Sequence, residues 1–508
     1  MEKFYITTAL AYVNAVPHIG HAYECIMADV LARYHRIKGD RVFFLTGTDE
    51  HGEKIQSVAE KKGIQPQEFA DEIVPYFKDM WRDLSISYDD FIRTTEDRHV
   101  RVVKKIFETL VASGDVYLGK YSGWYCVPCG DFWTQTQLTG ENCPECGRKV
   151  EHLEEDAYFF RMSKYANAIL RHYEENPDFI RPSSKRKEII NFVKEGLKDL
   201  CITRSALSWG IPVPGREDYT IYVWFDALLS YISAAGYEDA EGNFSSLWPA
   251  DMHIVGKDIL KFHVVIWPSI LLAAGIPLPK SVFAHGWWMV DGRKISKSLG
   301  NTIDPRQIME KHSPDALRYF LLREISPGLD GTFSIEAFEA RFNADLANDF
   351  GNLLNRSLSM IDKYFGGRIP PCGPSEDMDR ELTEKADTVI KDVPGYIETL
   401  NLNFALERIW QFINSANKYI EDSTPWTLKK NGSPRLGTVM YNLAESLRVI
   451  AILVYPFMPV KAADMWVQIG MEGSIEDIRL DAMAWGKTVS ETMTRKGSPL
   501  FPRIEKKQ

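Results

Sequence analysis

The first fifty residues alternate between strand-like and helix-like sequence, and this order restricts the fold more than any other feature of the chain. Residues 3–10 (KFYITTAL) have the pattern of a short strand, and residues 41–47 (RVFFLTG) that of a buried strand. The stretch between them has helical spacing and ends at Gly39 and Asp40. Strand, helix and strand in this order predict a right-handed crossover and a parallel sheet. The apolar positions that define the helix are Ile19, Tyr23, Ile26, Met27, Val30, Leu31, Tyr34 and Ile37.

The turn that leads into this helix carries His18, Gly20 and His21. In parallel α/β sheets, ligands bind beyond the carboxyl ends of the strands, which is where this turn is expected to lie. Amides at a helix N-terminus attract phosphate, and glycine lets a ligand approach the backbone closely. The two imidazoles can both donate to phosphate oxygens and stabilise the charge that develops when an α-phosphate is attacked. The simpler alternative is that these residues only close the turn, with one of them capping the helix.

A second polar segment, DGRKISKSLGN at residues 291–301, follows the strand-like sequence HGWWMV. Its Asp-Gly pair is typical of a tight turn, after which Lys294 and Lys297 stand in a short loop with Ser296 and Ser298. Ammonium and hydroxyl groups on a mobile loop suit a triphosphate or a leaving pyrophosphate. Alone, a lysine-serine run is usually a solvated loop. Together with the two histidines, in this order and in an α/β chain, it is a much more specific signal.

Four of the seven cysteines form two C-x-x-C pairs. Because thirteen residues separate the pairs, the spacing fits two knuckles that together hold one tetrahedral zinc ion. Disulfides are the alternative, which the two-residue gaps and a reducing compartment disfavour. Four thiolates would close the coordination sphere, so we expect a structural ion rather than a catalytic one. The predicted ligands are Cys126, Cys129, Cys143 and Cys146.

The chain contains no run of eighteen apolar residues, and it begins without the apolar region of a signal peptide. We therefore expect a cytoplasmic protein with no membrane partner. The net charge of −10 argues only weakly against nucleic acid, because binding needs a basic face rather than a basic total. With 508 residues, the chain is long enough for about two to four domains.

After the segment GLDGTFS the sequence becomes helical, which predicts an all-α bundle. Asn352 and Arg356 are four residues apart and so share a helix face. An amide and a guanidinium there can read the edges of unpaired bases, and Trp426 can stack on one, with the lysines that follow it adding positive charge. The alternatives are that Asn352 forms hydrogen bonds within the bundle and that Trp426 belongs to the core.

The tail beyond the helical region contains the segment SPLFPRI, in which Leu500, Phe501 and Ile504 need cover. We expect this segment to fold back onto the α/β half of the chain. About forty residues follow the last helical segment, too few for a further domain. Without a long apolar seam for pairing subunits, we expect a monomer.

Asp49 ends the second strand, where its carboxylate could pair with an ammonium group or simply cap the next helix. Tyr12, Trp224, Tyr231 and His263 are aromatic or polar-tipped residues scattered along the sequence. Each of them alone is more simply a core residue. Gathered around a ligand, aromatic walls would favour a thioether sulfur.

The segments HIGH at residues 18–21 and KISKS at residues 294–298 resemble the two signatures of class I aminoacyl-tRNA synthetases. The first matches letter for letter, and the second has Ile295 where methionine is usual, an apolar residue in either case. Blocks along nearly the whole chain resemble the methionyl-tRNA synthetase family, in the family's order: TALAYVN, TGTDEHG, YVWFDALLSYIS, GKDILKFH, NLLNR and TPWTLKK. Synthetases for leucine, isoleucine and valine are similar too, but they carry a larger editing insert than 508 residues leave room for.

The resemblance implies roles for individual residues of these blocks. It implies that the catalytic residues are His18, His21, Lys294 and Lys297, which bind ATP together with Gly20, Gly256 and Asp258, the last two near the ribose. It implies that methionine is bound by Leu10, Tyr12, Asp49, Trp224, Ala227, Leu228, Tyr231 and His263, with the Leu10 carbonyl and Asp49 on the ammonium. It also implies that Mg²⁺ accompanies ATP, that one structural Zn²⁺ occupies a single knuckle, and that the anticodon is read by Asn352, Arg356 and Trp426.

We therefore expect an α/β fold: a Rossmann-like parallel-sheet catalytic domain with an inserted zinc knuckle, followed by an all-α anticodon-binding bundle. The expected boundaries are 1–115 for the first half of the Rossmann domain, 116–185 for the connective insert, 186–289 for the second half, 290–340 for the lysine loop and stem-contact region, and 341–508 for the anticodon-binding domain with its tail.

The expected activity is the activation of methionine with ATP to methionyl-adenylate and its transfer to the 3′ end of tRNA(Met), with release of AMP and pyrophosphate. One alternative is a class I synthetase for another amino acid. Others are a noncatalytic tRNA-binding paralogue, against which the intact histidines and lysines argue, and a simple HxGH nucleotidyltransferase, against which the long helical domain argues.

Overall fold

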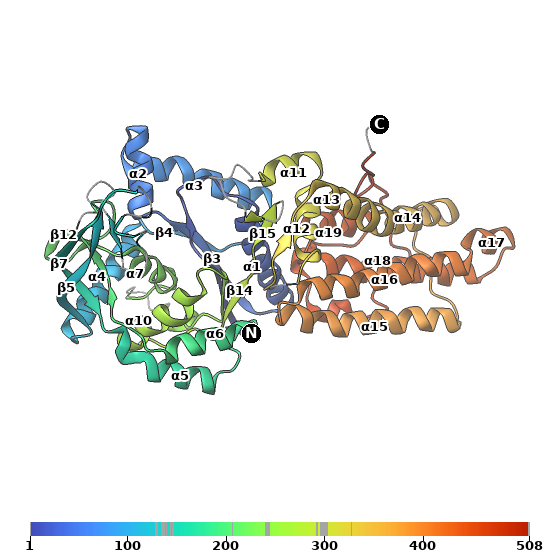
Figure 1. Ribbon diagram of the computed structural model, residues 1–508. Coiled ribbons are helices and arrows are strands. Elements are labelled where there is room, and N and C mark those ends of the chain that lie inside the picture. Colours follow the sequence, from blue (N-terminus) through green and yellow to red (C-terminus); the bar gives the residue numbers. More distant parts are fainter. Residues whose placement is uncertain are drawn as a thin grey trace.

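The molecule has two unlike parts, a larger α/β part from the N-terminal portion of the chain and a helical bundle from the remainder (Figure 1). The computed structural model describes residues 2–126, 131–133, 138, 140–142, 144, 147–205, 207–238, 244–290, 293–294, 303–326 and 328–505. In Figure 1 the α/β part runs from blue to yellow, and the bundle is orange to red. This division confirms the expected fold class, apart from the zinc knuckle, whose paired cysteines lie largely outside the described residues.

Within the described residues, a seven-stranded parallel sheet forms the centre of the α/β part. Its strands are β1 (Lys3–Thr8), β2 (Ala11–Tyr12), β3 (Arg41–Asp49), β4 (Asp90–Arg93), β8 (Ile180–Arg181), β13 (Met252–Gly256) and β14 (Val282–His285). The order is β2-β3-β1-β13-β14-β8, with β4 also paired to β3. Ile6 in the central strand lies opposite both Phe44 and Met252. Since β1 has β3 on one side and β13 on the other, its carboxyl end is the switch point at which ligands bind in such sheets.

Helix α1 (Ile19–Lys38) connects β1 to β3, as the sequence predicts. It ends at Gly39, whose φ of 94° is left-handed and favours glycine. The helix contacts the sheet and also the helices α12 (Pro314–Arg323) and α15 (Asp377–Glu398). Residues 25–34 are all buried, so α1 is the element that joins the sheet to the helical part of the molecule.

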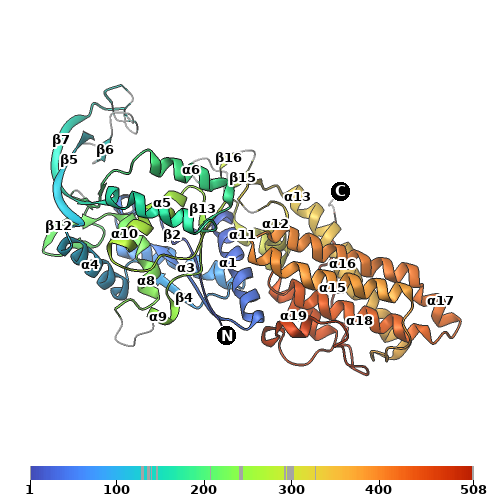
Figure 2. The same ribbon diagram turned by 90° about the horizontal axis from the view of Figure 1, so that it is seen from below.

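An antiparallel sheet projects from the α/β part as a curved arm, seen in Figure 2. Its order is β6-β5-β7-β9, with β5 at Val116–Cys126, β6 at Asp131–Trp133, β7 at Glu151–Phe160 and β9 at Leu200–Cys201. The expected insert at 116–185 does not coincide with this arm, because β8 within that range belongs to the parallel sheet and β9 beyond it belongs to the arm. The chain thus returns to the main sheet and then pairs with the arm again, a long-range exchange that local sequence patterns do not specify.

The other elements of the α/β part cover the sheets or lead to the bundle. The helices are α2 (Glu53–Lys62), α3 (Pro66–Asp83), α4 (Asp97–Ala112), α5 (Ala166–Glu175), α6 (Ser183–Lys194), α7 (Val223–Leu228), α8 (Ser230–Ala234), α9 (Phe244–Leu247), α10 (Trp267–Ala273) and α11 (Pro305–Lys311), with a 3-10 turn η1 (Met162–Tyr165) and a π-helical turn η2 (Phe262–Ile266). The short strands are β10 (Thr203–Arg204), β11 (Pro212–Val213), β12 (Arg216–Ile221), β15 (Trp288–Val290), β16 (Arg293–Lys294) and β17 (Gly331–Thr332).

The segment HGWWMV is divided between two strands rather than forming one. β14 ends at His285 and β15 begins at Trp288. The cause is a close approach at Gly286, where an added Cβ would lie 1.9 Å from the carbonyl oxygen of Leu329. β15 then pairs antiparallel with β16, with Val290 opposite Arg293, so the two strands flank the predicted Asp-Gly turn.

The C-terminal helices confirm the predicted all-α bundle. They are α13 (Ile335–Arg341), α14 (Asn352–Phe365), α15, α16 (Leu402–Ser423), α17 (Pro425–Lys430), α18 (Arg435–Val454) and α19 (Pro459–Gln468), with a π-helical segment η4 (Phe342–Gly351) between α13 and α14. By length and composition α18 could cross a membrane, but 94% of its apolar stretch is buried inside the protein. Its composition is explained by its place in the core of the bundle.

The tail does not fold back onto the α/β part, so that expectation was wrong. Leu500 and Phe501 are each 3% exposed, and the Phe501 ring centroid lies 5.7 Å from Phe342 and 6.1 Å from Phe350. The backbone N–H and carbonyl of Ile504 both bond to the Asn343 side chain. The aromatic face of η4 covers the tail, and such a face, formed only when the bundle folds, is not visible in the tail's own sequence.

Candidate active site

A cavity of about 1170 Å³ opens at the carboxyl ends of β1 and β3. Every residue that the sequence assigns to amino-acid binding lines this cavity, although these residues come from widely separated segments. Asp258 also lines it. The structure therefore brings together Leu10, Tyr12, Asp49, Trp224, Ala227, Leu228, Tyr231 and His263.

Asp49, the last residue of β3, has an unusual environment for a carboxylate. Its Oδ1 atom is buried and has no hydrogen-bond partner within the described part of the chain. Burial first, and the charge of Asp226 second, raise the pKa of the Asp49 carboxyl well above its ordinary value, while the His51 backbone amide acts in the opposite direction. A buried carboxylate oxygen without a partner is costly, so the place of this Oδ1 atom in a cavity wall indicates a site for a cationic group of a ligand.

Another part of the cavity, near α7 and η2, is aromatic. The Trp224 ring stacks on Phe262 with a centroid separation of 3.8 Å. His263 Nδ1 lies 3.0 Å from the carbonyl oxygen of Ile259, which can only accept, so Nδ1 carries the proton and the Tyr231 hydroxyl donates to Nε2 over 2.8 Å. Burial lowers the pKa of His263 to about 4, which keeps this ring neutral near pH 7.

His18 and His21 stand at the N-terminus of α1, as predicted. His18 Nδ1 accepts from the Gly20 amide at 3.0 Å, and His21 Nδ1 accepts from the His18 amide at 3.2 Å, which forms a reciprocal cap. A neutral imidazole that accepts at Nδ1 carries its proton at Nε2. The capping bonds use Nδ1 of each ring, so capping by itself does not conflict with a ligand contact at Nε2.

The end of β13 forms a further edge of the site. A Cβ added to Gly256 would lie 2.7 Å from Asp258 Oδ1, so this carboxylate lies directly over the backbone of the strand end. Trp287 donates its indole N–H to the same oxygen at 3.3 Å. Asp258 thus presents an acceptor at the rim of the cavity, suitable for hydroxyl groups of a ligand.

Several predicted residues are not described by the structure. Lys297, Cys129, Cys143 and Cys146 lie outside the described residues, and the same holds for the side chains of Lys294 and Cys126. Among the residues that are described, no group of three or more His, Cys, Asp or Glu side chains could hold a metal ion.

The three predicted base-reading residues lie on the bundle. Asn352 is exposed at the start of α14, and Arg356 one turn later is paired with Glu421 of α16 at 2.6 Å. Trp426 is 45% exposed on α17, so it is not a core residue. In Figure 1, α17 forms the end of the bundle that lies farthest from the parallel sheet.

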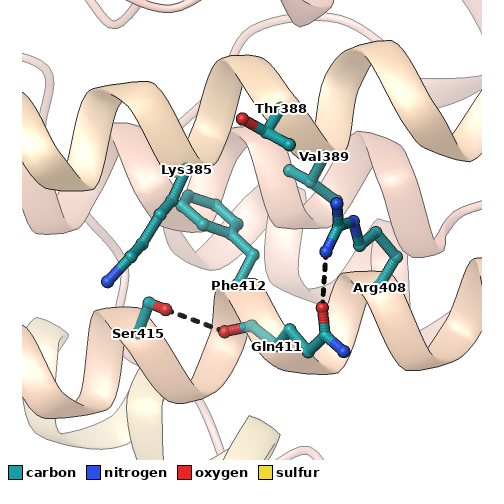
Figure 3. Close-up of a pocket in the computed structure, with 7 residues that line it drawn as sticks. All are labelled: Lys385, Thr388, Val389, Arg408, Gln411, Phe412 and Ser415. Carbon is teal, nitrogen blue, oxygen red and sulfur yellow. Dashed lines mark hydrogen bonds between the residues drawn. The ribbon is translucent and has the colours of Figure 1, made fainter.

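A second, smaller hollow of about 180 Å³ lies between α15 and α16 (Figure 3). Arg408, which lines it, donates to Gln411 at 2.8 Å and is paired with Asp392 at 2.7 Å. Lys385 is paired with Glu381 at 2.6 Å. The cations of this hollow are engaged with their neighbours, and none of the predicted site residues lies in it.

Two residues at or near the large site were missed by sequence reasoning. Arg204 lines the cavity, with its guanidinium 4.6 Å from the centroid of Tyr222. Glu24 does not line the cavity and its side chain is 14% exposed; it accepts from the Ala9 amide at 2.9 Å and bonds to His285 at 2.9 Å, so it fixes the end of β1. A lone arginine outside any motif and a glutamate in a helix give no local signal of either role.

The comparisons with known proteins agree over the whole chain. The family model "tRNA synthetases class I (M)" matches residues 4–153 and 146–358, and "Anticodon-binding domain of tRNA ligase" matches residues 379–495. A methionine–tRNA ligase of Caldanaerobacter subterraneus is 49% identical over 99% of this chain and 79% of its own length, and that of Thermotoga maritima is 46% identical over 99% and 81%. The structure of Mycobacterium tuberculosis methionyl-tRNA synthetase with methionyl-adenylate is similar with a TM-score of 0.92, at 41% identity over 99% of this chain and 100% of that one.

Proposed function

The chain belongs to the methionine–tRNA ligase family of class I aminoacyl-tRNA synthetases, and from that premise we propose that the cavity beside Asp49 is where it binds and activates methionine. The enzyme forms methionyl-adenylate from methionine and ATP and then charges tRNA, with release of pyrophosphate and AMP. The observation that carries the proposal is the buried Asp49 oxygen that lacks a partner among the described residues.

In this proposal, Asp49 and the carbonyl of Leu10 hold the ammonium of methionine, and the neighbouring cation Arg204 attracts its carboxylate. The thioether side chain then lies against the aromatic and apolar part of the cavity, where sulfur–aromatic contacts are favourable. The residues of that part are Tyr12, Trp224, Ala227, Leu228, Tyr231 and His263.

We propose that the first step takes place at the N-terminus of α1. A carboxylate oxygen of methionine attacks the α-phosphorus of ATP, and the bond to the oxygen of pyrophosphate breaks. The Nε2–H groups of His18 and His21 donate to phosphate oxygens whose charge grows in the transition state, and Gly20 leaves room for this approach. Lys294 and Lys297 neutralise the leaving pyrophosphate, and Mg²⁺ is the ordinary companion of ATP.

The ribose of ATP lies at the end of β13 in this arrangement. Gly256 has no side chain and lets the sugar approach the strand, and Asp258 accepts from its hydroxyls. In the second step the terminal ribose hydroxyl of tRNA attacks the methionyl carbonyl, and AMP leaves. Catalysis in both steps is mainly positioning and stabilisation of charge.

Substitution of the histidines tests this assignment. His21→Ala and His18→Asn should slow ATP–pyrophosphate exchange about 10²–10³-fold, corresponding to roughly 2.7–4 kcal/mol per lost donor, with little change in methionine affinity. His18→Asn is the sharper variant, because asparagine is a good helix cap but lacks a donor at the Nε2 position. Exchange at the wild-type rate in both variants would refute the assignment, and His172→Ala, outside the cavity, is the matched control.

A structural zinc ion in the arm is also part of the proposal. The described residues that flank the two cysteine pairs are antiparallel, with Cys126 opposite Asp131 and Asn142 bridged to Lys149, and this pairing supports the proposal of two knuckles. Four thiolates are the donor set that tetrahedral zinc prefers. The ion would supply folding stability to the arm and takes no part in the reaction, because its coordination sphere would be complete.

The bundle binds tRNA through its anticodon-binding domain, and we assign the reading of anticodon bases to Asn352, Arg356 and Trp426. The exposure of Trp426 supports this role, because an exposed indole can stack on an unpaired base. The pairing of Arg356 with Glu421 orients its guanidinium, and a base edge can exchange for this surface partner.

We also propose that the protein is a cytoplasmic monomer with the domain limits inferred from the sequence. The limits of the insert at 116–185 are the exception, because β8 belongs to the parallel sheet and β9 to the arm. Light scattering at micromolar concentration tests the oligomeric state. A single species with the 58.1 kDa mass of the chain is expected, and a stable species of twice that mass would contradict it.

A further inference from the structure

Asp226 does not line the amino-acid cavity, but its hydrogen bonds connect segments that carry cavity residues. It is fully buried on α7, the short helix that also carries the cavity residues Trp224 and Ala227. Its Oδ2 accepts from His51 Nδ1 at 2.7 Å, and its Oδ1 accepts from His99 Nε2 at 2.6 Å. One carboxylate thus ties α7 both to the turn after β3 and to α4.

The turn after β3 is the segment that directs Asp49, and it is held on two sides. Glu50 is fully buried and bonds to Arg93 at 2.7 and 2.8 Å, which fixes the turn to β4. His51 fixes it to α7 through Asp226. Asp49 lies one residue before Glu50 and two residues before His51. The direction of its carboxylate therefore depends on both of these anchored residues.

Two histidines face the Asp226 carboxylate, His51 at one oxygen and His99 at the other. The second ring nitrogen of His99, Nδ1, lies 3.1 Å from the Ser233 hydroxyl, which anchors the ring within the protein. Burial alone would raise the pKa of Asp226, but the two histidines hold it below its ordinary value, so Asp226 remains a carboxylate.

We propose that Asp226 is a positioning residue for amino-acid recognition: through His51 it holds the Asp49 turn at a fixed separation from the aromatic wall on α7. This rests on the proposed role of Asp49 in binding the ammonium of methionine. A ligand that contacts both Asp49 and the aromatic wall needs the separation between them to be correct, whereas a ligand without an ammonium group does not pair with Asp49. Loss of the His51–Asp226 bond should therefore weaken the binding of ligands that pair with Asp49 more than the binding of ligands that do not.

Calorimetric titration of two ligands tests this inference. The ligands are methionine and 4-(methylthio)butanoate, which has the same chain and carboxylate but no amino group. His51→Leu removes the bond to Asp226, whereas His51→Asn keeps an N–H donor at nearly the position of Nδ1. His35→Leu is the matched control, because it breaks another histidine–aspartate bond, of 2.8 Å to Asp40, at a residue that does not line the cavity.

The expected result is selective. His51→Leu should weaken methionine binding about tenfold or more and change binding of the desamino ligand less than about twofold, as loss of a charge-assisted hydrogen bond implies. His51→Asn should restore most of the affinity, Asp226→Asn should behave like His51→Leu, and the KM for ATP should not change. His35→Leu should bind both ligands as the wild type does.

Two outcomes would overturn the inference. If His51→Leu weakens both ligands by the same factor, the bond supports the pocket as a whole rather than the position of Asp49. If it weakens neither, the bond has no role in recognition. Failure of the proposed function is distinguishable, because the wild-type protein would then not bind methionine, or Asp49→Asn would bind it as tightly as the wild type.

Discussion

At the scale of single residues, Asp49 lowers the stability of the ligand-free protein but is suited to bind an ammonium group. Its carboxyl pKa lies above the ordinary value in the folded protein, so above the pKa of the unfolded state it opposes folding. Below that pKa the carboxyl is protonated in both states and the effect disappears. Binding of an ammonium group would remove the cost by giving the buried oxygen a partner.

Asp49→Asn should therefore stabilise the ligand-free protein at pH 7, by about 1–3 kcal/mol, while it abolishes measurable methionine binding. The gain should shrink as the pH is lowered toward the unfolded value of about 3.9. Thermal unfolding at several pH values measures the first effect and calorimetry the second. A variant that is less stable than the wild type at pH 7, or that still binds methionine, would contradict this reading of Asp49.

The residues proposed to bind methionine were inferred from a resemblance rather than from a physical argument. Local pattern explains why Asp49 ends a strand, but it does not show that Trp224 and His263 lie on the same cavity, because only tertiary folding brings them together. Arg204 and Asp226 were missed for the same reason. Arg204 lies outside the blocks that resemble the family, and although Asp226 lies within YVWFDALLSYIS, nothing local in that block indicates its bonds to two histidines that are distant in sequence.

At the scale of elements, α1 was predictable because its signals are local. Its apolar spacing, its N-terminal histidine and the left-handed Gly39 all lie within one stretch of sequence. The exchange of β8 and β9 between two sheets and the docking of the tail on η4 were not predictable. Both depend on pairing between segments that have no common periodicity.

The arm gives a prediction at this scale. Chelation or Cys126→Ala should release one zinc ion and loosen the arm, because the binding energy of a four-thiolate site contributes to folding. The identity of the amino acid that is activated should not change, since the residues proposed to bind methionine belong to other elements, although Tyr121, Glu154 and Glu155 of the arm also line the cavity. Metal analysis and limited proteolysis are the measurements. Protein purified under reducing conditions without zinc would count against the site.

At the scale of the whole molecule, a buried ionic cluster joins the α/β part to the bundle. Asp29 of α1 bonds to Arg33 at 2.8 Å and to Arg318 of α12 at 2.7 Å. Arg318 also donates to the carbonyls of Pro456 and Phe457, beyond the end of α18. Burial would raise the pKa of Asp29, but the two arginines hold it at about 2, so this carboxylate stabilises the fold above about pH 4 and loses that effect as the pH falls toward 2.

Arg318→Met should lower the free energy of unfolding by about 3–5 kcal/mol, because it leaves buried acceptors without a donor. Arg82→Met is the control, since the bonds from Arg82 to Asp79 and Asp83 lie at the surface, with the Arg82 side chain 69% exposed, and such pairs contribute little to stability. Urea denaturation measures both variants. Equal losses would mean that the cluster does not hold the two parts together.

ATP–pyrophosphate exchange, measured with each standard amino acid in turn, tests the central claim that this cavity selects and activates methionine. Rapid exchange is expected with methionine, slow exchange with every other amino acid, and loss of the methionine signal in Asp49→Asn. Faster exchange with another amino acid, or undiminished exchange with methionine in Asp49→Asn, would contradict this claim.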